Sequence, residues 1–133
     1  MKEADVLVVE DDAAINELIG EYLKLDGHTY RPALDGGSAL REAHDHAPNV
    51  VVLDVMLPDM DGFEICRRLK SDPRTKAVPV VMLSALADEQ SRQTGMQCGA
   101  VEYITKPFQP DQLLRAIKQY GCDCCNGNGR QAE

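Results

Sequence analysis

The sequence of 133 residues predicts one α/β domain in which five strands alternate with five helices around a doubly wound parallel sheet. Three observations predict this fold class. Short runs rich in Val, Leu and Ile recur along the chain and are separated by amphipathic stretches. The strongest run is apolar on both faces, as expected for a strand that helices cover on both sides. Polar residues follow the ends of several runs, where open parallel sheets form their sites.

The first half of the chain predicts three strands and two helices. A β-branched run at 6–9 indicates the first strand, which stops at the acidic residues 10–12. A weaker second strand is expected at 29–33, and the clearest strand at 49–54. A helix between the first two strands ends at Gly27. Its spacing of i, i+3, i+4, i+7 and i+8 predicts an inner face of Ile15, Leu18, Ile19, Tyr22 and Leu23. A short helix is expected at 38–46, with Leu40 and Ala43 inward.

The second half repeats the alternation. Asp61 can cap a helix with Phe63, Cys66 and Leu69 on its inner face, which Asp72 and Pro73 close. The remaining elements are a strand at 79–83, a weakly patterned polar helix at 88–98, a short strand at 101–104 and a last helix at 110–120.

Composition excludes several classes of protein. Fourteen basic against twenty-two acidic residues give a net charge of −8 and a pI near 4.8. This balance argues against direct binding to nucleic acid or to an anionic membrane. The longest apolar run is far shorter than the ~20 residues that span a bilayer, and the acidic N-terminal region does not resemble a signal peptide. We therefore expect a cytoplasmic protein without a membrane contact.

The five cysteines do not form the pattern of a secreted disulfide scaffold. Cys66 and Cys98 are expected to be small buried residues in helical segments. Cys122, Cys124 and Cys125 crowd into a Gly- and Asn-containing stretch, for which a thiol-bearing flexible tail is favoured over a soft-metal site. The histidines at positions 28, 44 and 46 are expected in solvent.

Candidate functional residues lie at the ends of the predicted strands. If the first and third strands are neighbours, Glu10, Asp11 and Asp54 converge, with Ser84 and Lys106 at the rim. Three close carboxylates repel one another, and a hard divalent cation or an ammonium relieves that repulsion. Mg²⁺ suits such a site because it needs only one or two carboxylates and keeps several waters. The cluster therefore predicts a phosphoryl acceptor in which an aspartate oxygen attacks phosphorus.

Four motifs in order resemble the receiver domain of two-component response regulators, of the chemotaxis-receiver type. They are Val-Val-Glu10-Asp11-Asp12, the stretch from Val50 through Asp54 to Gly62, Val-Met-Leu-Ser84-Ala85, and Tyr103-Ile-Thr-Lys106-Pro107-Phe108. The resemblance covers about residues 4–120. It implies a flavodoxin-like fold with strand order 2-1-3-4-5, a receiver domain at 1–120, and a flexible tail or the start of a linker at 121–133.

The resemblance also implies a role for each site residue. Asp54 is the expected phosphorylated aspartate, Ser84 the switch hydroxyl, Lys106 the phosphate-binding lysine and Tyr103 the switch aromatic. The expected Mg²⁺ ligands are Asp11, Asp54, Glu10 through water, and the backbone carbonyl of Met56. The peptide bond before Pro107 is expected to be cis. Glu10 and Ser84 depart mildly from the commoner Asp and Thr, and both keep the required chemistry.

Simpler structural roles remain open for some of these residues. Asp11, Asp12 and Asp61 each precede a helix and could be N-caps, which is a strong alternative for the last two. Tyr103 could be an ordinary aromatic residue of a strand.

The resemblance implies a switch that catalyses only its own phosphorylation and dephosphorylation and is not otherwise an enzyme. Its expected partner is a histidine kinase or a histidine phosphotransfer protein. A regulator of one domain and a receiver followed by a C-terminal output domain both remain open, as does a homodimer through the fourth helix, fifth strand and fifth helix. A dehalogenase-type phosphatase is disfavoured because Met56 stands where that class needs a second Asp. A flavodoxin-like cofactor binder is disfavoured because acidic residues replace the phosphate-binding loop after the first strand.

Overall fold

The computed structural model describes residues 4–121 and contains one parallel sheet of five strands in the order β2-β1-β3-β4-β5. This order confirms the expected topology. β3 lies at the centre, between β1 and β4, and is buried along its whole length. The strands are β1 Asp5–Val9, β2 Thr29–Ala33, β3 Val50–Leu53, β4 Val80–Ser84 and β5 Glu102–Thr105.

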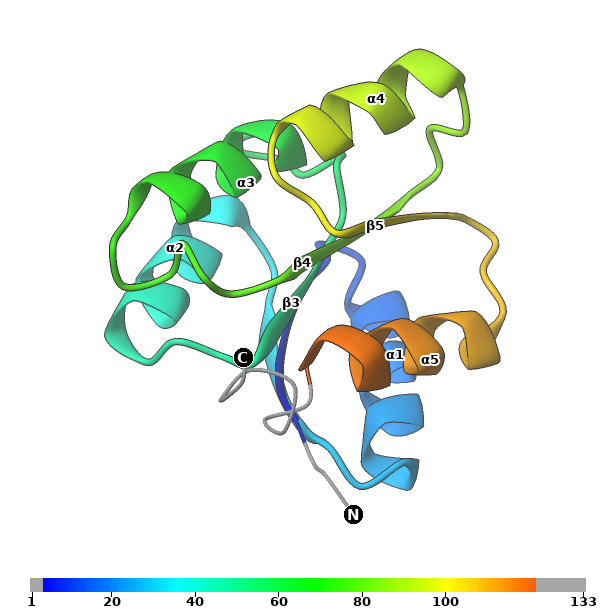
Figure 1. Cartoon of the computed structure of the whole chain (residues 1–133). Coiled ribbons are helices and arrows are strands. Elements are labelled where there is room, and N and C mark those ends of the chain that lie inside the picture. The colour runs from blue at the N-terminus through cyan, green and yellow to red at the C-terminus, as the bar shows by residue number, and fades with distance from the viewer. Residues whose placement is uncertain (1–3, 122–133) are drawn as a thin grey trace.

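Five helices cover the two faces of the sheet, with α1 and α5 on one face and α2, α3 and α4 on the other (Figure 1). Two apolar clusters fill the spaces between helices and sheet, because alternate residues of each buried strand point to opposite faces. The helices are α1 Ala13–Leu25, α2 Gly36–Asp45, α3 Gly62–Ser71, α4 Glu89–Gln97 and α5 Pro110–Gly121.

Element boundaries agree with the sequence prediction to within a few residues. α2 begins two residues earlier than expected because Asp35 caps it, accepting a hydrogen bond from the Ser38 N–H. Ser84 is the last residue of β4 and not the residue after it. α5 extends one residue beyond the expected end to Gly121, which is buried. Cys122, Cys124 and Cys125 lie outside the described residues.

The predicted inner face of α1 was partly wrong. The buried residues are Asn16, Ile19, Gly20 and Leu23, whereas Leu18 is 47% exposed. The apolar spacing assigned the polar Asn16 and the small Gly20 to the outer face of the helix, but both residues are buried against the sheet. The Asn16 amide bonds backbone carbonyls at the strand ends, and Gly20 leaves room for the Tyr30 ring.

The histidine prediction was wrong for His28, which is buried. Its Nδ1 accepts a hydrogen bond from the Ala4 N–H at 3.0 Å, and its Nε2 lies 3.2 Å from Asp26. Two polar partners thus replace water around the ring. His44 and His46 are exposed, and Cys66 and Cys98 are buried, as predicted.

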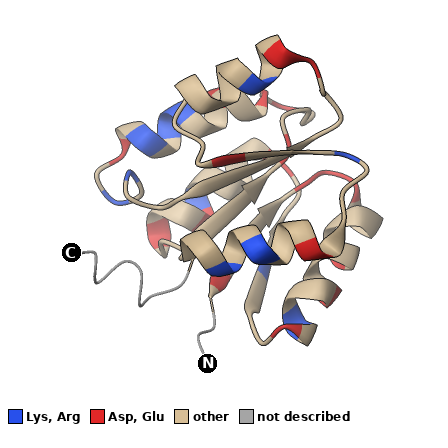
Figure 2. Cartoon of the chain, turned by 45° about the vertical axis from the view of Figure 1, so that its right-hand side comes forward, with Lys and Arg blue, Asp and Glu red and all other residues tan. Residues whose placement is uncertain are grey.

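Asp12 and Asp61 are helix N-caps, so their structural role is confirmed. Asp12 accepts hydrogen bonds from the N–H groups of Ala14 and Ile15. In the view of Figure 2, acidic and basic segments are interspersed over the helices. Between residues 4 and 121, no helix is both long and apolar enough to cross a bilayer.

Candidate functional site

The sheet itself positions the predicted site residues. The acidic residues, Ser84 and Lys106 lie at or just beyond the carboxyl end of a strand, whereas Tyr103 lies within β5. The ladder of backbone hydrogen bonds continues into the strand ends. The Asp54 N–H donates to the Val9 carbonyl, the Glu10 N–H to Ala33, and the Lys106 N–H to Ser84, at 2.8–3.0 Å. Hydrogen bonds to the neighbouring strand therefore fix the backbone position of each of these residues.

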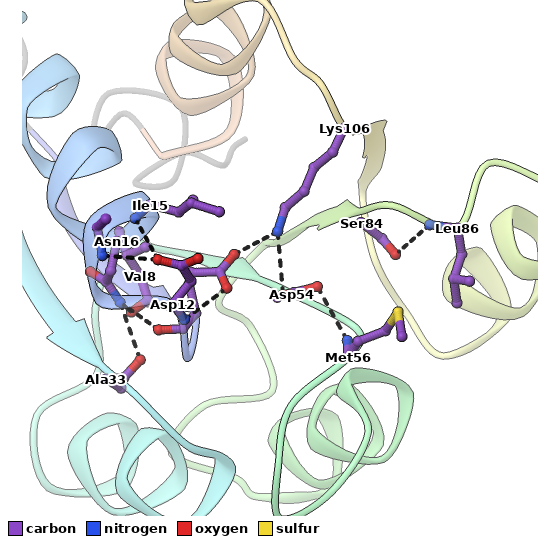
Figure 3. Close-up of polar contacts among 12 residues, drawn as sticks. Val8, Asp12, Ile15, Asn16, Ala33, Asp54, Met56, Ser84, Leu86 and Lys106 are labelled. Atoms are coloured by element: carbon purple, nitrogen blue, oxygen red, sulfur yellow. Dashed lines mark hydrogen bonds and ion pairs between the residues drawn. The ribbon is translucent and has the colours of Figure 1, made fainter.

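Glu10, Asp54 and Lys106 form a connected polar cluster (Figure 3). The Lys106 ammonium reaches from the end of β5 to within 2.6 Å of Glu10 Oε1 and 3.4 Å of Asp54 Oδ2. Glu10 and Asp54 are only 3% and 6% exposed, whereas Asp11 is exposed at the mouth of the site. One lysine thus partly balances two buried carboxylates.

The remaining carboxylate oxygens of this cluster bind backbone N–H groups. Glu10 Oε2 accepts from the Asp12 N–H at 3.1 Å, and Asp54 Oδ1 accepts from the Met56 N–H at 3.2 Å. Both bonds join positions two residues apart, so they orient the carboxylates relative to their own loops.

Burial and hydrogen bonding act in opposite directions on the pKa values of Glu10 and Lys106. Burial raises the pKa of the Glu10 carboxyl, and it outweighs the opposing effect of the hydrogen bonds from Lys106 and Asp12. Burial by itself would lower the pKa of Lys106, but the hydrogen bond to Glu10 and the charge of Asp54 raise it overall. Lys106 is therefore held in its charged form beside the two carboxylates.

The three carboxylates fit a divalent cation. Glu10, Asp11 and Asp54 each offer an oxygen, and these oxygens all lie within 4.8 Å of one another. Hard oxygen ligands of this kind suit Mg²⁺, which needs few protein ligands and keeps several waters. The exposed position of Asp11 leaves one side of the cluster open to those waters.

Asn16 is a buried residue of the site that the sequence analysis missed. Its Nδ2 lies 3.0–3.3 Å from the carbonyl oxygens of Val8, Glu10 and Ala33, and its Oδ1 accepts from the Tyr30 hydroxyl. These bonds tie the end of β1, which carries Glu10, to α1 and β2. The available signal was a polar residue at helical spacing from Ile19 and Leu23.

Ser84 and Tyr103 meet at one backbone position, Leu86. The Leu86 N–H donates to Ser84 Oγ at 3.0 Å, and the Leu86 carbonyl accepts from the Tyr103 hydroxyl at 2.7 Å. The Tyr103 ring is buried under α4, against Gly95, with the Arg92 guanidinium 5.3 Å from its centroid. The ring thus fills a buried position in this structure.

Two apolar side chains lie on the same side of Asp54. Met56 is 58% exposed and Leu86 is half-buried, and Figure 3 places both on the Ser84 side of Asp54. The Lys106–Pro107 peptide bond is cis. A cavity of about 1080 Å³ lies elsewhere, between α1, β2 and α2, and includes none of the predicted site residues.

Residues 6–118 match the response regulator receiver domain family. The phosphate regulon transcriptional regulatory protein PhoB of Escherichia coli is 40% identical over 113 residues, which is 85% of this chain and 49% of PhoB. The chain spans about half the length of several curated relatives that it matches.

Solved structures give the same assignment. The chemotaxis protein CheY4 of Vibrio cholerae has a TM-score of 0.82 and 30% identity, covering 90% of this chain and 98% of CheY4. The receiver domain of the sensor histidine kinase PA1611 from Pseudomonas aeruginosa, which has a magnesium ion in its active site cleft, has a TM-score of 0.81 and 28% identity. This match covers 90% of this chain and 96% of the PA1611 receiver domain. With the order of its strands and the acidic site at their carboxyl ends, this chain belongs to the response regulator receiver domain family.

Proposed function

We propose that this chain is a phosphoacceptor switch in which Asp54 receives a phosphoryl group and the surface around α4 and β5 responds. The single observation that carries this proposal is the cluster of Asp54, Glu10 and Asp11, with the Lys106 ammonium 3.4 Å from Asp54. This arrangement combines a nucleophile, a cation site and a fixed positive charge at one end of the sheet.

The proposed reaction is phosphoryl transfer from a phosphohistidine of a histidine kinase or a phosphotransfer protein. An oxygen of Asp54 attacks phosphorus, the phosphorus–nitrogen bond breaks, and its electron pair leaves with the imidazole, which takes a proton from water. Mg²⁺, held by Glu10 through water, by Asp11, Asp54 and the Met56 carbonyl, would neutralise charge on the phosphoryl oxygens. Lys106 supplies a second positive charge, and Ser84 donates a hydrogen bond to a phosphoryl oxygen.

The proposal is tested by treating the protein with acetyl phosphate and weighing it. We expect one added phosphoryl group in Mg²⁺ and none when EDTA removes the metal. Equal uptake in both conditions would contradict the proposed role of the cation. The chain would catalyse only its own phosphorylation and dephosphorylation, since Met56 leaves no second Asp to turn over an external substrate.

Replacing Lys106 with Ala should leave Mg²⁺ binding intact or strengthen it. The Lys106 ammonium competes with a cation for the carboxylates of Glu10 and Asp54. Removing this positive charge should therefore not weaken Mg²⁺ binding. Phosphorylation should become slower by about tenfold or more, because one charge that stabilises the transferring group is gone. Calorimetric Mg²⁺ titration and the labelling rate measure the two effects. A collapse of Mg²⁺ affinity would show that Lys106 acts as a structural support.

Phosphorylation should strengthen the connection from Ser84 to α4. A phosphoryl oxygen that accepts from the Ser84 hydroxyl would leave Ser84 Oγ still bound to the Leu86 N–H, and Leu86 bound to Tyr103. The sparse burial of α4, in which Gly95 is the buried residue, makes this helix a suitable moving part.

Hydrogen exchange with and without beryllofluoride, a phosphoryl mimic, tests this connection. We expect slower exchange at Leu86, in α4 and in β5, by about fivefold or more. Ser84→Ala should remove the effect. A change confined to the loop after Asp54 would contradict the proposed route.

The partners of the whole protein follow from the same proposal. We propose an output domain after the receiver, as the length of the relatives suggests, and a homodimer through α4, β5 and α5. The acidic charge and the expected cytoplasmic location are consistent with signalling without direct contact to nucleic acid or membrane.

A further inference from the structure

The loop between β3 and α3 carries the Met56 carbonyl that the proposed function places on the cation. Two bonds fix its base: the Gly62 N–H donates to the Val55 carbonyl at 2.7 Å, and the Met56 N–H donates to Asp54. In the middle of the loop, Leu57 and Met60 pack partly against the apolar core, whereas Met56, Pro58 and Asp59 are exposed. A polar contact that fixes the exposed positions would help to hold the Met56 carbonyl at the proposed cation site.

Asp59 supplies that hold through the N-terminus of α2. Its Oδ1 accepts from the Gly36 N–H at 2.8 Å, and its Oδ2 accepts from the Gly37 N–H at 2.9 Å. The Gly36 and Gly37 N–H groups lower the pKa of the Asp59 carboxyl, so it stays charged for these bonds. One side chain thus joins the loop to a helix more than twenty positions earlier in the chain.

Close backbone packing supports the same contact. A Cβ atom at Gly36 would lie 2.7 Å from Met60 Cγ and 2.9 Å from Ile65 Cδ1, so the loop and α3 press directly on the first turn of α2. The local cap of α2 is a different residue, Asp35, which accepts from the Ser38 N–H at 2.7 Å. The α2 N-terminus therefore binds two carboxylates, one from its own cap and one from the loop after Asp54.

We propose that Asp59 is a positioning residue for the cation site: by binding the first N–H groups of α2, it holds the loop that directs the Met56 carbonyl at the metal. This inference rests on the proposed function. Residues outside the ligand set that orient a ligand commonly change metal affinity by about 10- to 100-fold. The coupling is reciprocal, so Mg²⁺ at the site also stabilises the first turn of α2.

Asp35 provides a matched control for the experiment. Asp59→Ala and Asp35→Ala each remove one acidic charge and one carboxylate from the same helix end, but only Asp59→Ala releases the loop. Calorimetric titration with Mg²⁺ should show affinity lowered about tenfold in Asp59→Ala and nearly unchanged in Asp35→Ala. In the wild type, Mg²⁺ should slow hydrogen exchange at Gly36 and Gly37, and Asp59→Ala should abolish that slowing.

Asp59→Asn keeps the test decisive if Asp59→Ala does not fold. Its amide oxygen can accept from one of the two N–H groups, so we expect a smaller loss of Mg²⁺ affinity than the loss expected for Asp59→Ala. Equal Mg²⁺ affinity in the wild type and the Asp59 variants would overturn this inference and leave the proposed function standing. An equal loss in Asp35→Ala and Asp59→Ala would overturn it as well, because helix stability alone would then explain the effect. A wild-type protein that binds no Mg²⁺ would contradict the proposed function itself.

Discussion

Replacing Asp54 with Asn should reduce phosphoryl uptake to the background level. The amide has nearly the shape of the carboxylate, and its single oxygen can still accept from either Lys106 or the Met56 N–H. The neutral amide is a poor nucleophile because it lacks the negative charge of the carboxylate. The loss therefore reports on chemistry at Asp54 and not on a disturbed fold.

Asp12→Asn is the control for this variant. Asp12 lies beside the site but caps α1 with its side chain, so its replacement should leave uptake close to that of the wild type. Both variants are treated with acetyl phosphate and Mg²⁺ and weighed intact. Uptake by Asp54→Asn equal to that of the wild type would show that another group accepts the phosphoryl.

Phosphorylated protein should persist for many minutes or longer in Mg²⁺ buffer without a kinase. Hydrolysis needs a water aligned opposite the bond between Asp54 and phosphorus. The residues two positions beyond Asp54 and Ser84 are Met56 and Leu86, and neither side chain can orient a water or accept its proton. Both side chains can shield the phosphoryl group from water, so we expect slow hydrolysis.

The double variant Met56→Asn, Leu86→Glu should lose its phosphoryl group at least about tenfold faster, since it restores polar groups that can position water. The apolar pair Met56→Leu, Leu86→Met controls for changes in packing and should decay at the wild-type rate. Intact mass followed over time after removal of the phosphodonor measures each rate. Loss from the wild type within seconds, or no acceleration in the polar variant, would contradict this account.

Much of the fold follows from local signals that the sequence carries openly. The β-branched run at β1 and the Val-rich run at β3 can be buried on both faces only in a covered parallel sheet. Polar residues at the strand ends then meet, because parallel strands end at one edge of the sheet. The grouping of Glu10, Asp54 and Lys106 could therefore be predicted from the sequence. The caps Asp12 and Asp61 were predictable for the same local reason.

Features that depend on contacts between distant segments were not predictable from local pattern. Asn16 and His28 look like surface residues, but each is buried because backbone groups of other elements satisfy it. The inward ring of Tyr103 depends on the Leu86 carbonyl and on Gly95 in α4. The Asp59 bonds to α2 likewise join segments whose proximity only the fold establishes.

The most direct measurement of the central claim is the chemical location of the phosphoryl group. Wild-type protein is phosphorylated in Mg²⁺, the acyl phosphate is reduced with borohydride, and the peptides are sequenced by mass spectrometry. We predict that Asp54 is the converted residue, with no conversion in the sample treated with EDTA. Conversion at Glu10, Asp11 or another carboxylate while Asp54 remains unmodified would contradict the assignment of Asp54 as the phosphoacceptor.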